Sequence, residues 1–120
     1  MSLFVSILRK KAEARREYFR NYEFYARKIG EYCKNKLGEV RIFLFGSIID
    51  GSWDMESDID VLVVSPFCPP HLYQRAKLIG EIRFELGKFN PFEIHLITPE
   101  EYKEWYSNFI KDKIREIPLD

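Results

Sequence analysis

Two aspartates, Asp58 and Asp60, stand two residues apart at the start of an apolar run over residues 59–64. Side chains two positions apart on a strand leave the same face, so these two carboxylates would lie side by side. Carboxylates that close repel each other unless water surrounds them, they share a proton, or a cation binds. Mg²⁺ prefers such oxygen ligands. Taken alone, the pair fits a surface turn as well as it fits a metal site.

A glycine and a serine, Gly46 and Ser47, follow a second apolar run over residues 40–45. Glycine lets the backbone turn sharply at the end of a strand. A serine that opens the next helical turn offers a hydroxyl and backbone N–H groups, which can hold a phosphate. Ser47 is also typical of an ordinary helix N-cap, so this pair alone leaves both interpretations open.

A third apolar run, over residues 92–97, carries Glu93 and His95, again two apart and therefore on one face. An acid in so apolar a strand costs free energy unless it is paired or bound to a metal. If the strands are neighbours, Asp58, Asp60 and Glu93 can converge on two cations, an arrangement that stabilises in-line phosphoryl transfer. His95 either extends this site or is a hydrogen-bonded structural residue.

The segments before, between and after these apolar runs include stretches with helical spacing of apolar residues. Apolar residues recur at helical intervals up to Gly38, a plausible helix stop, and prolines open two later helices. The pattern predicts an α/β (α+β) fold in which about three strands are flanked by helices and preceded by a long N-terminal helix. The expected order is helix (1–37), strand (40–45), strand (59–64), helix (69–86), strand (92–97) and helix (99–111).

The composition bounds the class of protein. A chain of 120 residues that is 46% hydrophobic can bury one core, so we expect a single domain over residues 1–120. No stretch approaches the roughly 20 apolar residues of a membrane span, and the start lacks a secretion signal, which predicts a cytoplasmic protein without membrane contact. Cys33 and Cys68 have no metal-type spacing, and we assign them no function.

Charge is distributed unevenly although the net charge is zero. Residues 1–38 hold ten Lys and Arg against four Asp and Glu, and residues 39–120 hold nine against fifteen. The basic segment fits a contact with nucleic acid or an acidic partner, and it also fits a solvated helix face. The acidic remainder argues against nucleic acid as the partner.

The motifs taken together resemble a known family. Phe-Gly-Ser at residues 45–47, ten further residues and Asp-Ile-Asp at residues 58–60 resemble the signature of the DNA polymerase beta-type nucleotidyltransferase superfamily, in the spacing of its minimal members. The resemblance runs over residues 40–97, which would form the catalytic core. It implies a short mixed sheet with flanking helices, in agreement with the order of elements above.

The resemblance implies a role for each motif residue. Gly46 and Ser47 would hold the triphosphate of ATP, and Asp58 and Asp60 would bind two Mg²⁺ ions. Glu93 would be the third carboxylate, placing one metal and helping to deprotonate the acceptor hydroxyl. This chain departs from many relatives because no basic residue stands at positions 48–51, which raises the question of catalytic competence. Candidates to meet the triphosphate charge instead are Arg75, Lys77, Arg83 and Lys88, although each of them fits a solvated helix face better.

The acceptor follows from the same resemblance. Larger members of the superfamily add a domain that grips the acceptor, and 120 residues leave no room for one. Minimal members resemble the antitoxin of a toxin–antitoxin pair whose partner is a HEPN-type toxin, and the implied reaction is adenylylation of a toxin tyrosine. Two alternatives remain: a catalytically weak or inactive protein that neutralises its partner by binding, and a stand-alone small-molecule nucleotidyltransferase.

Overall fold

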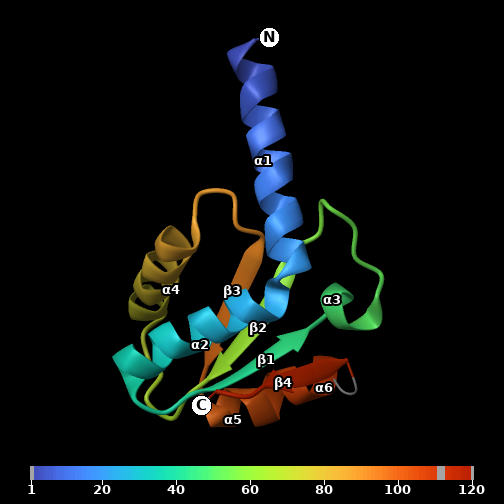
Figure 1. Cartoon of the computed structure of the whole chain (residues 1–120). Helices are drawn as coiled ribbons and strands as arrows, with labels where there is room; N and C mark the ends of the chain where they lie inside the picture. The colour runs from blue at the N-terminus through green and yellow to red at the C-terminus, as the bar shows by residue number, and fades with distance from the viewer. Residues whose placement is uncertain (1, 111–112, 120) are drawn as a thin grey trace.

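The protein, described here by a computed structural model over residues 2–110 and 113–119, is built on a four-stranded mixed sheet (Figure 1). The strands are β1 (Arg41–Phe45), β2 (Ile59–Val64), β3 (Phe92–Ile97) and β4 (Ile114–Ile117). They lie in the order β3-β2-β1-β4, where β2 and β3 are parallel and the other neighbours are antiparallel. The expected α/β fold class, a mixed sheet with helices, is confirmed.

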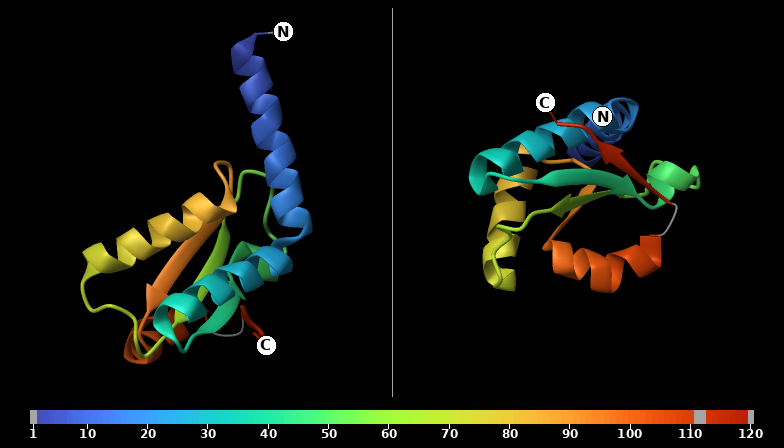
Figure 2. Two further views of the ribbon diagram at one scale, coloured as in Figure 1. Left: turned by 60° about the vertical axis from the view of Figure 1, so that its left-hand side comes forward. Right: turned by 90° about the horizontal axis from the view of Figure 1, so that it is seen from below.

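Helices cover both faces of the sheet (Figure 2). They are α1 (Leu3–Arg20), α2 (Tyr22–Leu37), α3 (Ser47–Asp50), α4 (Leu72–Leu86), α5 (Pro99–Glu101), the π-helical η1 (Tyr102–Tyr106) and α6 (Ser107–Ile110). The end of α1, α2 and α4 share the main core with one face of the sheet, while η1 packs on a smaller cluster on the other face. Within the described residues, no helix is both long and apolar enough to cross a membrane.

The long N-terminal helix expected over residues 1–37 is divided in two; Met1 lies outside the described residues. Asn21 leaves helical geometry, with φ −119° and ψ 35°, and its side chain donates a hydrogen bond to Glu17. Asparagine has a low helix propensity, so a helix breaks at this residue at little cost. The break turns α2 onto the sheet and leaves α1 projecting from the body (Figure 1).

The C-terminal segment also differs from expectation. The helix expected over residues 99–111 is present as one helical stretch over residues 99–110, in which the π-helical η1 lies between α5 and α6, and Lys111 lies outside the described residues. A capping box starts it, in which the Thr98 hydroxyl accepts from the N–H of Glu101 and the Glu101 carboxylate accepts from the N–H of Thr98. The sequence predicted no strand after it, yet β4 pairs with β1 and extends the sheet to four strands.

Two glycines provide a test of how closely α2 packs on the sheet. A Cβ at Gly30 of α2 would lie 2.6 Å from Ile42 Cγ1 and 2.7 Å from Leu119 Cδ2, whereas one at Gly80 of α4 would meet no atom within 4 Å. We predict that Gly30→Ala lowers the free energy of unfolding by about 1–3 kcal/mol through overpacking. Gly80→Ala should raise it by about 0.5–1 kcal/mol, since alanine favours a helix. Urea unfolding measures both, and shifts of the same sign would contradict this packing.

Candidate functional site

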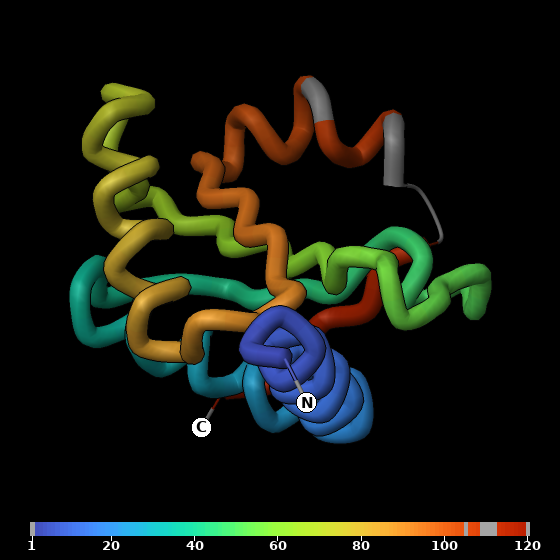
Figure 3. The backbone as a smooth tube through the Cα atoms, turned by 90° about the horizontal axis from the view of Figure 1, so that it is seen from above, coloured from blue at the N-terminus to red at the C-terminus, as the bar shows by residue number. Residues whose placement is uncertain are grey.

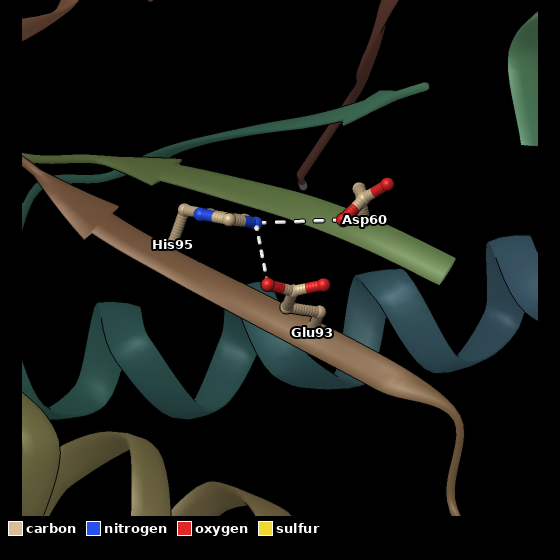
Figure 4. Close-up of side chains that lie close together, drawn as sticks. All are labelled: Asp60, Glu93 and His95. Carbon is tan, nitrogen blue, oxygen red and sulfur yellow. Dashed lines mark hydrogen bonds and ion pairs between the residues drawn. The ribbon is translucent and has the colours of Figure 1, made fainter. Parts of the chain in front are cut away.

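Three side chains with metal-ligating atoms meet on two neighbouring strands. The parallel register of β2 and β3 sets Asp60 beside Glu93 and Leu62 beside His95. His95 Nε2 lies 3.4 Å from Asp60 Oδ1 and 3.8 Å from Glu93 Oε1 (Figure 4). One ligand atom from each of Asp60, Glu93 and His95 lies within 4.8 Å of the others. The structure therefore brings together two of the three carboxylates expected from the sequence, with His95 beside them.

The alternation of β2 fixes the direction in which Asp60 points. Ile59, Val61 and Val63 have no exposed surface and lie in the main core. Because successive side chains on a strand point to opposite faces, Asp60 must leave the other face, where its side chain is 23% exposed. The sequence favours this arrangement strongly, since a slip of one residue would turn the Asp60 carboxylate into the main core.

Asp58 is placed differently from Asp60. It precedes β2 and is exposed, and it lies outside the group of three that gathers its ligand atoms within 4.8 Å. Its charge nevertheless acts on Glu93, whose pKa it helps to raise. Asp58 therefore stands at the edge of the site, exposed and within electrostatic reach of Glu93.

Electrostatics at Glu93 favour a cation. Partial burial raises the pKa of Glu93 above its usual value, Asp60 and Asp58 raise it further, and His95 opposes the shift. The Glu93 side chain is still 54% exposed. The free-energy cost of this acid, which we expected from its apolar strand, therefore comes from the neighbouring carboxylates as well as from burial. A cluster of carboxylate oxygens with excess negative charge fits Mg²⁺, which usually takes one or two carboxylates and completes its shell with water or phosphate oxygens.

Gly46 lies against the same aspartate from the β1 side. Phe45 pairs with Asp60 in the sheet, and a Cβ at Gly46 would come 2.6 Å from Asp60 Oδ2. Gly46 has φ +77°, which side-chain-bearing residues rarely adopt. It is the cap residue of α3, so Ser47 is the first helical residue and not the N-cap that the sequence alone allowed. Only glycine allows the chain to turn here in contact with the carboxylate.

The loop that leads to Asp58 is held by α1, a contact that the sequence did not predict. Arg15 donates from Nε to the Met55 carbonyl at 2.7 Å and from Nη2 to the Ser57 carbonyl at 2.6 Å. Phe19 stacks on Trp53 of the same loop, with ring centroids 4.8 Å apart. The basic run over residues 9–16, which interrupts the apolar stripe of the helix, was the only sequence signal for this contact.

The basic residues proposed from the sequence do not gather at Gly46 and Ser47. Arg75 is ion-paired with Glu101 at 2.8 Å, and the guanidinium of Arg83 donates to the Phe92 carbonyl. Lys77 lies in α4, as Arg75 and Arg83 do, and Lys88 follows this helix. The helix α4 packs at the β3 side of the sheet. The lysine near α3 is Lys113, whose Nζ lies 3.7 Å from Asp50 Oδ2 at the end of that helix. The sequence analysis missed it.

Comparisons with known proteins show what the chain is similar to. The family model for the nucleotidyltransferase domain matches residues 26–118. A crystal structure provisionally assigned as a nucleotidyltransferase is similar, with 30% sequence identity, a TM-score of 0.61 and coverage of 76% of this chain and 95% of that one. A second, from Sulfolobus solfataricus and with the same provisional assignment, shares the fold at 19% identity, a TM-score of 0.59 and 83% coverage of both chains. No curated protein matches the chain.

We predict that Glu93→Gln changes stability in opposite directions with and without a divalent cation. Without one, the variant should unfold at the same or a higher temperature at pH 7, because it removes a carboxylate whose pKa is raised in the folded protein. Wild type should gain about 2.7 kcal/mol of stability at a Mg²⁺ or Mn²⁺ concentration one hundred times its Kd. The variant should lose most of that gain.

The matched control is Glu56→Gln, because Glu56 is an exposed carboxylate in the loop before β2. It should respond to the cation as wild type does. Thermal unfolding across a cation titration measures all three proteins. If Glu93→Gln gains as much stability from the cation as wild type does, Glu93 is not a ligand of the metal.

Proposed function

The chain belongs to the nucleotidyltransferase domain family, and we propose that it transfers AMP from ATP to a hydroxyl group with the help of Mg²⁺. The observation that carries the proposal is the cluster of Asp60, Glu93 and His95. The glycine turn at Gly46 lies directly against the Asp60 carboxylate of this cluster. Asp58, Asp60 and Glu93 would hold two Mg²⁺ ions. When bound, such ions stabilise the charge that develops during phosphoryl transfer.

The remaining roles belong to the chain itself. Gly46 and Ser47 would hold the triphosphate, since the Ser47 hydroxyl forms no hydrogen bond with any other described residue and stands at the start of α3. The acceptor oxygen forms a bond to the α-phosphorus, and its proton passes to the Glu93 carboxylate. The bond between the α-phosphorus and the bridging oxygen breaks, and pyrophosphate leaves.

The acceptor that we propose is a tyrosine of a HEPN-type toxin, which would make this chain the antitoxin of the pair. The shape of α1 supports a protein partner. It projects from the body (Figure 2) beside the loop that leads to Asp58. Its first turns expose large apolar side chains. The exposed fractions are 78% for Leu3, 68% for Phe4 and 48% for Leu8. Exposed apolar surface of this kind is typical of an interaction site.

The proposal predicts transfer of label from ATP, labelled at the α-phosphate, to a HEPN-type protein encoded beside this chain. Asp60→Asn should lower the rate more than about 100-fold, because substitutions that only neighbour a metal site already cost 10- to 100-fold. Asp58→Asn should also lose transfer, and Glu56→Gln should keep it. Absence of label with wild type, or equal transfer by Asp58→Asn, would refute catalysis. Inhibition of the toxin that survives substitution of both aspartates would instead support the binding-only alternative.

Lys113 is predicted to replace the basic residue that positions 48–51 lack. Ile114, its neighbour, pairs with Phe45 immediately before Gly46, so Lys113 lies near the proposed triphosphate. Lys113→Ala should raise the KM for ATP roughly threefold to tenfold, as expected for a partly exposed ionic contact of about 1 kcal/mol. Lys77→Ala on α4, a candidate from the sequence, should leave it unchanged. The reverse result would assign the triphosphate to the α4 side.

A further inference from the structure

A cleft of about 590 Å³ opens between α4 and η1, along the edge strand β3. Its walls are mainly apolar and include Leu72, Ala76 and Ile79 of α4, Ile94 of β3 and Tyr106 of η1. His95 lines the same cleft and also points its Nε2 atom toward Asp60 and Glu93 (Figure 4). Figure 3 shows α4 and η1 as separate elements on either side of β3. The cleft therefore adjoins the candidate metal site.

The charges in the cleft select an uncharged ligand group. Arg75 is the only Lys or Arg among the described residues that line it, and its side chain is only 9% exposed. It is ion-paired with Glu101 and donates to the carbonyls of Pro69 and Leu96, so its charge is already compensated. Glu93, whose Oε1 atom lies 3.8 Å from Nε2 of the cleft residue His95, would repel an anion. A neutral, mainly apolar group fits this lining better than a phosphate does.

The position of the cleft relative to Gly46 indicates which reactant enters it. Gly46 faces Oδ2 of Asp60 from the β1 side, whereas His95 faces Oδ1 from the β3 side. In-line transfer places the leaving pyrophosphate and the attacking oxygen on opposite sides of the phosphorus. If the triphosphate lies at Gly46 and Ser47, the acceptor must come from the β3 side, where the cleft opens.

We propose that this cleft binds the acceptor, a flat aromatic ring that carries a hydroxyl, in the form of a tyrosine side chain presented by a partner protein. The inference rests on the proposed function for the direction of approach. The ring packs between Ile79 and Tyr106, and its hydroxyl reaches past His95 to the carboxylates. Aromatic rings pack well edge-on or offset against such a wall. The cleft thus supplies an acceptor site that belongs to this chain.

Binding of a small probe tests the cleft independently of any transfer reaction. N-acetyl-tyrosinamide, added to the full chain, should shift the NMR signals of the Ile79 and Ile94 methyl groups. Ala76→Trp, which fills the cleft, should abolish these shifts, while Gln74→Trp, exposed on α4 outside the cleft, should retain them. Absence of shifts with wild type would overturn the proposal, even if label transfer to a protein succeeds.

Kinetics distinguish the acceptor from the nucleobase, the other flat group in the reaction. With a tyrosine acceptor, Ala76→Trp should raise the acceptor KM about tenfold or more and leave the KM for ATP unchanged. Leu72→Ala, at a side chain that is 76% exposed and so unimportant for folding, should raise the acceptor KM by a smaller factor. A rise in the KM for ATP alone would identify the cleft as a nucleobase pocket and overturn the proposal. If wild type transfers no label but binds the probe at Ile79 and Ile94, the proposed function is wrong, whereas the proposal that the cleft binds a tyrosine side chain is supported.

Discussion

Parallel pairing of β2 with β3 is the constraint on which the site depends, because it holds Asp60 and Glu93 at neighbouring positions on one face. Their ligand atoms lie within 4.8 Å of each other, and two such charges repel by about 1–4 kcal/mol near a protein surface. The opposite face of the same strands outweighs this repulsion. Ile59, Val61 and Phe92 have no exposed surface, and each buried side chain of this kind contributes about 1.5–3 kcal/mol. Hydrophobic burial on one face therefore holds together a repulsive cluster on the other.

The sheet alone does not complete the site, since its other parts come from distant segments. Arg15 of α1 reaches across 42 residues of sequence to the carbonyl of Ser57 and so holds the loop that ends at Asp58. The pairing of β4 with β1 brings Lys113 to the end of α3. Each contact adds a group near the end of β1 and the start of β2, where Gly46 and Asp58 lie. The N-terminal and C-terminal segments thus contribute to the site although they lie outside its motif.

The parts of the fold that the sequence predicted are those with a local signal. The strands β1, β2 and β3 have an apolar pattern of period two or a continuous apolar run, and the direction of Asp60 follows from that pattern alone. By contrast, β4 is four residues long with one buried residue, and its partner lies about 70 residues earlier. No local pattern reports such pairing. Arg75 was a phosphate candidate by charge, yet its ion pair with Glu101 depends on a tertiary contact.

Asp60 is fixed more firmly than the other acidic residues of the site. The strand sets its direction, the backbone of Gly46 approaches one carboxylate oxygen, and His95 lies beside the other. Asp58 is held only through the loop that Arg15 anchors, and Lys113 is 67% exposed. Residues on rigid strands hold a reacting geometry, whereas residues on loops adapt to what binds. The division fits a site in which one carboxylate provides a fixed reference point and the groups around it close on the nucleotide.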